Sequence, residues 1–407
     1  MKTDFDIVIV GAGMVGACTA ALLARSQLTA AARIALVDAR PPAAPAADAD
    51  IDLRVSAISR ATERILTACG VWDAVRRARI HPYERMTVWE GGSAPGRSGA
   101  VHFDAAELGE PNLGYIVENR WLQFQLFDAA ARAGVAVFRQ AVASFEPGET
   151  HATLGLVEGR ALTARLAIGA DGADSPTRRL AGIETRGWGY AQEALVTHVR
   201  TELPHLDTAR QRFLDTGPIA LLPLADGRSS IVWTTTPDRA LALKEIDDRD
   251  FAHAVERATD RVLGAVTAGA PRASFPLRLL HAQDYVRQRL VLVGDAAHAV
   301  HPLAGLGVNL GFLDAAALVE TLADAGSAGA ELGDARVLRR YERWRKGENL
   351  AAMGLVDGIN RLFANASPAL SGLRRFGLGA VDRLPPVKHF FMRRALGTRG
   401  ELPRMAR

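Results

Sequence analysis

Three places where apolar runs end carry the residues with which this sequence could do chemistry. The first is a glycine turn, in which Gly11, Gly13 and Gly16 follow the apolar run Phe5 to Val10 in the spacing G-x-G-x-x-G. Apolar and small residues continue to Ala24 and suit a helix. A strand, a tight turn and a helix N-terminus bring N–H groups and positive potential to one point, which favours a pyrophosphate. The same spacing also suits a close helix–strand packing turn without a ligand.

Acidic residues stand at the ends of three later strands. Asp38 ends the run 33–38, Asp171 follows the run 165–170, and Asp295 follows the run 289–294. Ligands bind at the carboxyl ends of strands in a doubly wound sheet, so Asp171, Asp295 and the glycine turn should meet at one crevice. A carboxylate there can accept hydrogen bonds from ribose or ribitol hydroxyls. Asp38 is placed for an adenosine ribose and would repel a 2′-phosphate.

A second glycine-rich stretch lies in the last third of the chain. The run Ala304 to Gly311 lets the backbone approach a flat ring closely, and its N–H groups could stabilise negative charge on a reduced flavin. We expect a long helix after it, from about Phe312 to Ala325. His301, followed by Pro302, is a candidate proton relay to a phenol. His298 is expected to serve as a structural hydrogen-bonding residue.

Arg54 offers a cation near the first crevice. It lies at the start of Leu53 to Leu66, a segment whose apolar spacing suits a helix, and it could reach a phosphate or simply lie at the surface. Asn119 is expected to cap a helix over 120–133. The histidines lack carboxylate or thiol partners at ligand spacing, so no metal site is expected.

The pattern of elements that must position these residues is that of an α/β protein. Buried parallel strands are expected at 5–10, 33–38, 165–169 and 289–293, whereas a period nearer two between 187 and 280 indicates an inserted sheet domain. The final segment from Asp334 should be helical. The two cysteines, Cys18 and Cys69, cannot form a disulfide framework, which fits a cytoplasmic protein.

Composition suits a soluble enzyme, with 407 residues, 48% hydrophobic and 23% charged. The uncharged stretch Ile7 to Ala24 imitates a signal peptide or membrane span, but Asp4, Asp6 and the three glycines argue against both. Residues 339–407 hold 15 Lys or Arg against 5 Asp or Glu, whereas the rest of the chain is slightly acidic. This basic tail fits either an anionic membrane or protein surface or a solvated face; no nucleic-acid-binding motif accompanies it.

Three motifs occur in order along the sequence: Gly11–Gly16, Asp171–Gly172 and Gly294–Asp295. In these motifs the sequence resembles the class A FAD-dependent aromatic hydroxylases, which share the p-hydroxybenzoate hydroxylase fold. More narrowly, it resembles the ubiquinone-biosynthesis hydroxylases. The stretches that carry this narrower resemblance are Asp52–Ser59, Glu118–Leu122, Gly217–Leu224, Ser229–Trp233, His301–Gly311, Leu384–His389 and Arg394–Gly397.

The resemblance implies a role for each matching position. Gly11, Gly13 and Gly16 would hold the FAD pyrophosphate, Asp38 the adenosine ribose and Asp295 the ribitol side. Arg54 and Arg120 would contact FAD, and Asp171 would sit near the crevice and also serve NAD(P)H. The residues by the flavin pyrimidine edge would be Gly305, Leu306, Gly307, Val308 and Asn309. Two positions depart from the family pattern: Asp38 stands where Glu is more usual, and Leu306 stands where Gln is usual in the ubiquinone enzymes.

The fold implied is a Rossmann-like FAD-binding domain with an inserted, mainly antiparallel β-sheet substrate domain and a helical C-terminal segment. We expect the FAD-binding domain at 1–80, 118–182 and 281–340, the substrate domain at 81–117 and 183–280, and the helical segment at 341–407. The implied activity is hydroxylation of a polyprenylated phenol or quinol through a flavin C4a-hydroperoxide, with O₂ as co-substrate and NAD(P)H or another reductant as electron donor.

Two other functions fit the same motifs. One is an FAD hydroxylase of a soluble aromatic acid, and the other is a low-turnover flavin-binding scaffold of a biosynthetic complex. Expected partners are a lipophilic aromatic substrate, other ubiquinone-biosynthesis proteins, a second copy of the chain and the inner face of the membrane. Near the C-terminus, Val387, Phe390, Phe391 and Ala395 lie among Lys388, Arg393 and Arg394, which suits either an interfacial helix or a helix packed on the FAD domain.

Overall fold

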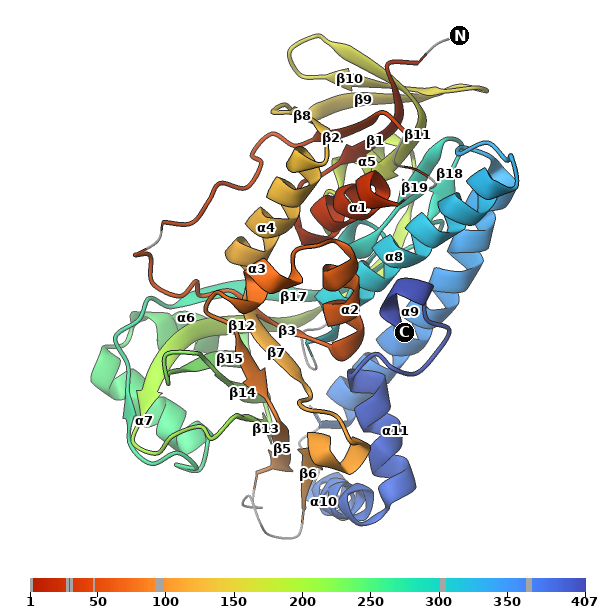
Figure 1. Ribbon diagram of the computed structural model, residues 1–407. Helices are drawn as coiled ribbons and strands as arrows, with labels where there is room; N and C mark the ends of the chain where they lie inside the picture. Colours follow the sequence, from red (N-terminus) through yellow and green to blue (C-terminus); the bar gives the residue numbers. More distant parts are fainter. Residues whose placement is uncertain are drawn as a thin grey trace.

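The computed structural model describes residues 3–26, 29, 32–46, 48–91, 99–300, 305–363 and 368–407. Two large sheets dominate the described part, one above the other in Figure 1. The first sheet is parallel through five strands, with an antiparallel edge strand and a hairpin added to β11. Its spatial order is β18 (Val286–Arg287), β19 (Leu290–Leu292), β11 (Ala161–Gly169), β1 (Phe5–Val10), β2 (Ile34–Val37) and β8 (Ala136–Phe138), with the hairpin β9 (Val142–Pro147) and β10 (Ala152–Leu156).

The central strand β1 and its neighbour β2 are apolar without alternation because consecutive side chains are buried on both faces of the sheet. Ile7, Val8 and Ile9 are completely buried. The helices α1 (Met14–Arg25) and α4 (Asn119–Arg132) pack side by side in front of the sheet, and α8 (Leu306–Ser327) packs against α1. Cys18 and Cys69 are both free and buried here, as expected, with their sulfur atoms 3.5 Å apart.

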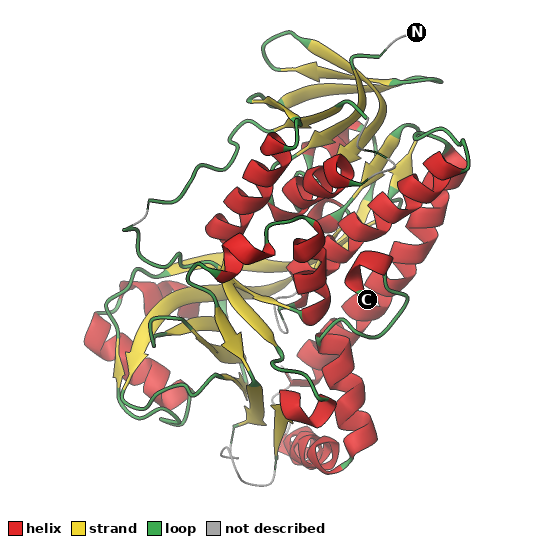
Figure 2. Ribbon diagram, viewed as in Figure 1, coloured by secondary structure: helices red, strands yellow, loops and turns green. Residues whose placement is uncertain are grey.

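The second sheet is mainly antiparallel, as the period-two pattern predicted (Figure 2). Its order is β20 (His298–Ala299), β17 (Ala273–Ala282), β12 (Thr185–Thr201), β15 (Ser229–Thr235), β14 (Gly217–Pro223), β13 (Thr208–Leu214), β5 (Arg85–Glu90) and β6 (Ala100–Asp104), with β16 (Val266–Thr267) beside β12. One face of this sheet buries Leu195, Ile219 and Trp233 against helices α6 (Pro237–Glu245) and α7 (Asp248–Ala258). Alternate residues therefore face the other way, toward the first sheet.

A small sheet and several short helices join the two large sheets. The small sheet orders β3 (Val55–Ile58), β7 (Gly114–Glu118) and β4 (His81–Tyr83). The short helices are α2 (Arg60–Ala68), α3 (Trp72–Arg76), η1 (Ala105–Leu108), α5 (Pro176–Leu180) and η2 (Gly294–Ala296). The predicted helix over 53–66 was wrong in its first half, because Val55–Ile58 pairs with β7 and the helix begins only after Ser59, whose side chain accepts from the N–H of Thr62.

Two other predicted boundaries also need correction. Helix α4 is capped by Glu118, without a side-chain hydrogen bond, whereas the Asn119 side chain accepts a hydrogen bond from the Ser56 hydroxyl at 2.7 Å. Helix α8 begins at Leu306, six residues earlier than expected, after Gly305 in a left-handed conformation. The glycines that suggested irregular backbone instead allow close helix packing: a Cβ at Gly311 would lie 2.6 Å from a methyl carbon of Val15.

The C-terminal part is helical, as predicted, with α9 (Ala335–Phe363), α10 (Pro368–Arg383), α11 (Pro385–Ala395) and η4 (Arg404–Ala406). Met392 of α11 and Leu396, which caps its C-terminus, pack against Ala105 and Leu113, next to β6 of the second sheet. None of the described helices is both long and apolar enough to cross a membrane. The proposed domain boundaries stay a prediction.

Candidate functional site

The turn between β1 and α1 is fixed on both sides by side-chain hydrogen bonds. The N–H of Ala12 donates to a carboxylate oxygen of Asp38 at 2.6 Å, and the side-chain amide of Gln123 donates to the carbonyl of Ala12 at 3.0 Å. Asp38 also accepts from the N–H of Arg40 at 2.7 Å. Asp38 therefore positions the glycine turn, in addition to lying at the end of β2; sequence reasoning did not find Gln123.

The three glycines of the turn differ in what surrounds them. Gly11 has φ +103°, and a Cβ there would lie 2.5 Å from the carbonyl oxygen of Ala170; a Cβ at Gly16 would lie 1.9 Å from the carbonyl oxygen of Gly11. Backbone packing alone requires these two glycines. A Cβ at Gly13, by contrast, would meet no atom within 4 Å. Gly13 leaves open a space that the chain itself does not fill.

Two helix N-termini border that space. Helix α1 has Gly13 as its N-cap and α8 has Gly305, and neither cap makes a side-chain hydrogen bond. Neither helix carries an acidic residue in its first turn. The free N–H groups and the positive ends of the helix dipoles therefore favour an anion or a polarised ring oxygen in this space.

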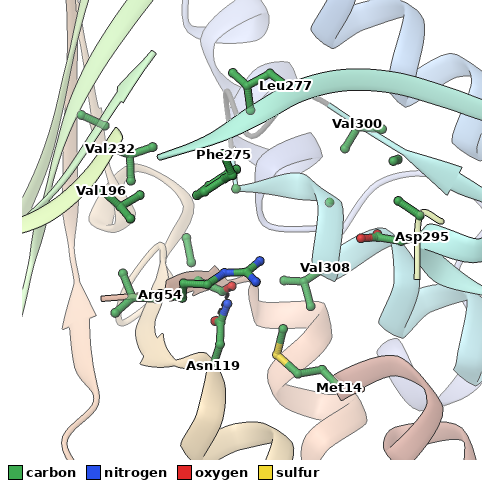
Figure 3. Close-up of a pocket in the computed structure, with 18 of the residues that line it drawn as sticks. Met14, Arg54, Asn119, Val196, Val232, Phe275, Leu277, Asp295, Val300 and Val308 are labelled. Carbon is green, nitrogen blue, oxygen red and sulfur yellow. Dashed lines mark hydrogen bonds between the residues drawn. The ribbon is translucent and has the colours of Figure 1, made fainter. Parts of the chain in front are cut away.

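The space is a cavity of about 790 Å³ that extends from the glycine turn to the second sheet. Figure 3 shows Arg54 between Val196 and Val232 of the sheet on one side and Met14 and Val308 on the other. The cation of Arg54 lies 5.6 Å from the centre of the Phe275 ring and has no ion-pair partner among the described residues. Arg54 is exposed and lines the cavity, which is compatible with both of its predicted positions, near a phosphate or at the surface.

The sheet wall of the cavity is mainly apolar, and Gln211 contributes an amide to it. Gln211, Ala220, Val232 and Val196 form one row across four neighbouring strands, because each is in register with the next. All four line the cavity. Gln211 is only 7% exposed, and its amide makes no hydrogen bond within the described residues. An enclosed amide without a partner is costly, so this position calls for a ligand or water.

Asp295 lies across the cavity from the sheet wall, in the 3-10 turn η2 that follows β19 (Figure 3). Its surroundings raise the pKa of its carboxyl: burial is the main cause, and the electrostatic influence of His298, Arg54 and Arg278 opposes it. Its side chain nevertheless opens onto the cavity. Arg278 pairs with Asp174 at 2.7 Å, and both also line the cavity.

The side chain of Asn309 makes hydrogen bonds within the protein and does not line the cavity. Its side-chain oxygen accepts from the N–H of Ser59 at 3.0 Å and from the hydroxyl of Thr62 at 2.7 Å. Its amide nitrogen donates to the carbonyls of Ala57 at 2.8 Å and Gly305 at 2.7 Å. Asn309 thus fastens the first turn of α8 to the β3–α2 connection, and it positions Gly305, Gly307 and Val308 at the cavity.

The other predicted site residues divide into three groups. Asp171 accepts hydrogen bonds from Ser175 and from the N–H of Thr177, so it shapes the loop before α5, and its neighbours Gly172 and Asp174 line the cavity instead. Arg120 is exposed in the first turn of α4, outside the cavity lining. His301 and Pro302 lie outside the described residues, and Leu306 is described only in its backbone.

A buried polar network that the sequence analysis missed supports η2 from behind. Asp314 of α8 accepts from the N–H of Gly294 at 3.1 Å and from Arg345 and Asn349 of α9, and it lies 2.5 Å from Nε2 of His298. The two positive neighbours lower the pKa of Asp314 to about 2, against the opposing effect of burial. The structural role expected for His298 is confirmed. The sequence signal that could have indicated this network is Asp314 itself, a single carboxylate in the otherwise apolar stretch 310–319.

One cluster outside the cavity combines two histidines and a carboxylate, which sequence spacing could not show. The ligand atoms of His81, His205 and Asp207 lie within 4.8 Å of one another. Hydrogen bonds already account for them: Asp207 lies 2.7 Å from His81 and donates its N–H to Nδ1 of His205, whose Nε2 lies 3.2 Å from the carbonyl of Leu224. The cluster is explained without a metal.

The described features fit FAD well. The open space at Gly13, the two uncapped helix N-termini, the unpaired Arg54 and the acceptor Asp295 meet in one cavity, with an apolar wall over it. The described chain thus combines a parallel sheet that carries a glycine turn at β1 with a second sheet that faces it, an arrangement that suits a dinucleotide cofactor at the strand ends. Residues 4–350 match the model of the FAD-binding domain family. The chain belongs to this family of FAD-dependent monooxygenases, and FAD is its cofactor.

Individual relatives agree with this assignment along the whole chain. The chain is 39% identical to 3-demethoxyubiquinol 3-hydroxylase of Escherichia coli, covering 96% of this chain and 98% of that protein. It is 38% identical to ubiquinone hydroxylase UbiL of Rhodospirillum rubrum, covering 97% and 90%. Among solved structures, p-nitrophenol 4-monooxygenase PnpA of Pseudomonas putida superposes with a TM-score of 0.76 at 20% identity, covering 97% and 99%, which supports the fold.

Proposed function

We propose that this protein hydroxylates the aromatic ring of a polyprenylated phenol or quinol in ubiquinone biosynthesis. The observation that carries the proposal is the apolar sheet wall of 196, 220 and 232, which faces the two uncapped helix N-termini across one continuous cavity. The relatives named as ubiquinone and demethoxyubiquinol hydroxylases support the substrate class. O₂ as co-substrate and NAD(P)H as electron donor are consistent with the monooxygenase class.

We assign the cofactor-binding roles from the geometry of the cavity and of the glycine turn, since Asp38 contacts the turn and lies outside the described cavity lining. The N–H groups at Gly13 and at the start of α1 would receive the pyrophosphate, Asp38 would accept from the adenosine ribose, and Asp295 would accept from the ribitol. Arg54 would neutralise a phosphate from inside the cavity, whereas Arg120 would have to act from its edge. The N–H groups of residues 306–308 would face the ring, held there by Asn309.

Bound FAD supplies the activation of O₂, and the protein's own residues orient the substrate and keep water out. The sheet wall offers the ring and its apolar tail a surface of Val, Ala and Pro side chains. Gln211 can bond to a ring oxygen, because it lines the cavity and its amide has no hydrogen-bond partner among the described residues. The Arg on this sheet that lines the described cavity, Arg278, is already paired with Asp174, which favours a neutral ring over a soluble aromatic acid.

Two measurements test the proposal. FAD-loaded protein given a reductant, a prenylated phenol and isotopically labelled O₂ should transfer one labelled oxygen atom to the ring. A strain without the gene should accumulate an under-hydroxylated quinone precursor. An unchanged quinone pool in that strain, with no second gene to compensate, would contradict the pathway. FAD binding without substrate-dependent O₂ uptake would instead identify a scaffold.

We further propose peripheral association with a membrane through α10 and α11. Phe376 is 75% exposed, and Leu384, Val387 and Phe390 are exposed beyond it. The basic residues Arg383 and Arg393 are exposed on the same two helices. Exposed aromatic side chains beside cations are typical of a helix that lies in the headgroup region of an anionic bilayer.

A further inference from the structure

A second cavity, of about 570 Å³, lies between the β12–β17 pair and helix α9. It shares none of its described lining residues with the cavity at Gly13. The strands contribute two cross-strand pairs on one face, Arg186 with His281 and Trp188 with Leu279. The facing stripe of α9 is formed by residues 346, 350, 353 and 357, whose spacing places them on one side of a helix.

The strand side and the helix side each contribute a cation. Arg186 has no hydrogen-bond or ion-pair partner among the described residues, and Lys346 donates to the carbonyl of Gln283. The carboxylate of Asp357 also borders the cavity, but it is already paired with Arg361 at 2.8 Å. The cavity therefore has an excess of positive charge.

His281 lies in the cavity lining without a partner. It is 91% buried, since its exposed fraction is 9%, and its Nε2 has no hydrogen-bond partner in the described structure. Burial lowers the pKa of its imidazole to about 4, and Lys346, His298 and Arg186 contribute to the same effect. The ring is thus neutral near pH 7, and the field around it favours a negative charge.

The rest of the lining is apolar and partly open to solvent. Trp188 is 45% exposed and Leu350 is 47% exposed, although Met353 between them and the protein interior is buried. These large apolar side chains are partly exposed to water on both sides of the cavity. An apolar molecule that covers them would lower the free energy by removing their surface from water.

We propose that this cavity binds a molecule that joins an apolar body to one carboxylate. The carboxylate would lie between Arg186 and Lys346, and the body would cover Trp188 and Leu350. A single negative charge fits better than a phosphate dianion, because Asp357 also borders the cavity. This site is independent of the hydroxylation reaction, so its failure and the failure of the proposed function can be told apart.

Gly354 provides a variant that fills the cavity without harming the helix. It lines the cavity, and a Cβ there would meet no atom within 4 Å. Gly354→Leu should therefore occupy the ligand space, and a helix interior favours Leu over Gly. Gly347 is the matched control, since it lies in the same helix, also has no atom within 4 Å of a Cβ, and is outside the lining.

The test is calorimetric titration of the FAD-loaded protein with decanoate, decanol and acetate. Decanoate should bind saturably, decanol at least about tenfold more weakly, and acetate not measurably. Arg186→Ala should weaken decanoate about tenfold, Gly354→Leu should abolish its binding at this site, and Gly347→Leu should leave it unchanged. Equal affinity for decanol and decanoate, or unchanged decanoate binding in Gly354→Leu, would overturn the proposal. The latter result would place the carboxylate outside this cavity.

Discussion

The Nε2 atom of His298 lies 2.5 Å from a carboxylate oxygen of Asp314, and neither side chain has more than 1% of its surface exposed. The same carboxylate holds the N–H of Gly294, next to Asp295 at the cavity. Arg345, which is equally enclosed, pairs with its second oxygen at 2.8 Å. One buried carboxylate thus connects α8, α9 and the turn that presents Asp295.

Asp314→Asn should therefore be strongly destabilising. The substitution leaves the buried guanidinium of Arg345 without a counter-charge, and removal of one member of a buried pair costs about 3–5 kcal/mol. Denaturant unfolding measures the effect. Asp324→Asn in the same helix is the control, because its partners Arg340 and Arg404 are exposed, and it should cost less than about 1 kcal/mol. Equal effects of the two substitutions would show that the buried network around Asp314 stabilises the fold no more than the exposed ion pairs of Asp324 do.

The glycine turn gives a prediction that separates folding from cofactor binding. Gly16→Ala should destabilise the FAD-free protein by about 1–3 kcal/mol, because its Cβ overlaps the carbonyl of Gly11. Gly13→Ala should change that stability by less than about 1 kcal/mol, since its Cβ enters open space. The same Gly13 variant should weaken FAD at least about tenfold if the pyrophosphate occupies that space. Thermal unfolding without FAD and FAD titration provide the two readouts.

Gln211→Leu should impair the reaction without affecting the cofactor. Loss of one neutral hydrogen bond to a ring oxygen should lower kcat/KM about three- to tenfold, and a less well-oriented ring should release more H₂O₂ for each reductant consumed. FAD affinity should not change. Gln140→Leu, which alters a surface hydrogen bond to Glu158, should leave both values unchanged. An unaltered kcat/KM in Gln211→Leu would remove this residue from the substrate site.

Stability should fall in mildly acidic solution because of His281. Its folded pKa, about 4, is below the ordinary value of 6.5, so the unfolded chain binds a proton more readily between these pH values. The contribution is complete above pH 6.5 and is lost as pH falls toward 4. Wild-type protein should lose more stability than His281→Asn over this interval, by roughly 1–3 kcal/mol once solvent screening is allowed for. A difference that does not vary with pH would contradict this, and the exposed His253→Asn serves as control.

Membrane association should depend on the exposed aromatic residues of α10 and α11. The double variant Phe376→Asp and Phe390→Asp should lose most of its co-sedimentation with anionic vesicles, because both side chains are at the surface and would bury apolar area in the bilayer. Leu241→Asp, on α6 and with an exposure between those of Phe376 and Phe390, should sediment like wild type. Retention of vesicle binding by the double variant would place any membrane contact elsewhere.

The sequence predicted the strands and the crevice well, because a buried parallel strand that ends in Gly or Asp has a local pattern. Gly11 to Gly16 and Asp295 could be located for this reason. Roles that depend on distant partners could not be predicted. Asn309 reads as a cavity residue until its four bonds to 57, 59, 62 and 305 are known. Likewise, Val55–Ile58 has a helical spacing of apolar residues, and only pairing with β7 makes it a strand.

The bond between Asn309 and Ser59 joins positions 250 residues apart. The glycine turn is synthesised first, but Gly305 and the start of α8 leave the ribosome only after three quarters of the chain. A cavity that is closed by contacts of such high sequence separation forms late in folding. The chain loses loop-closure entropy when these contacts form, before any contact with a ligand offsets the loss. Nascent chains that stop before residue 305 should therefore not retain FAD. FAD binding would then occur only after most of the chain has been synthesised.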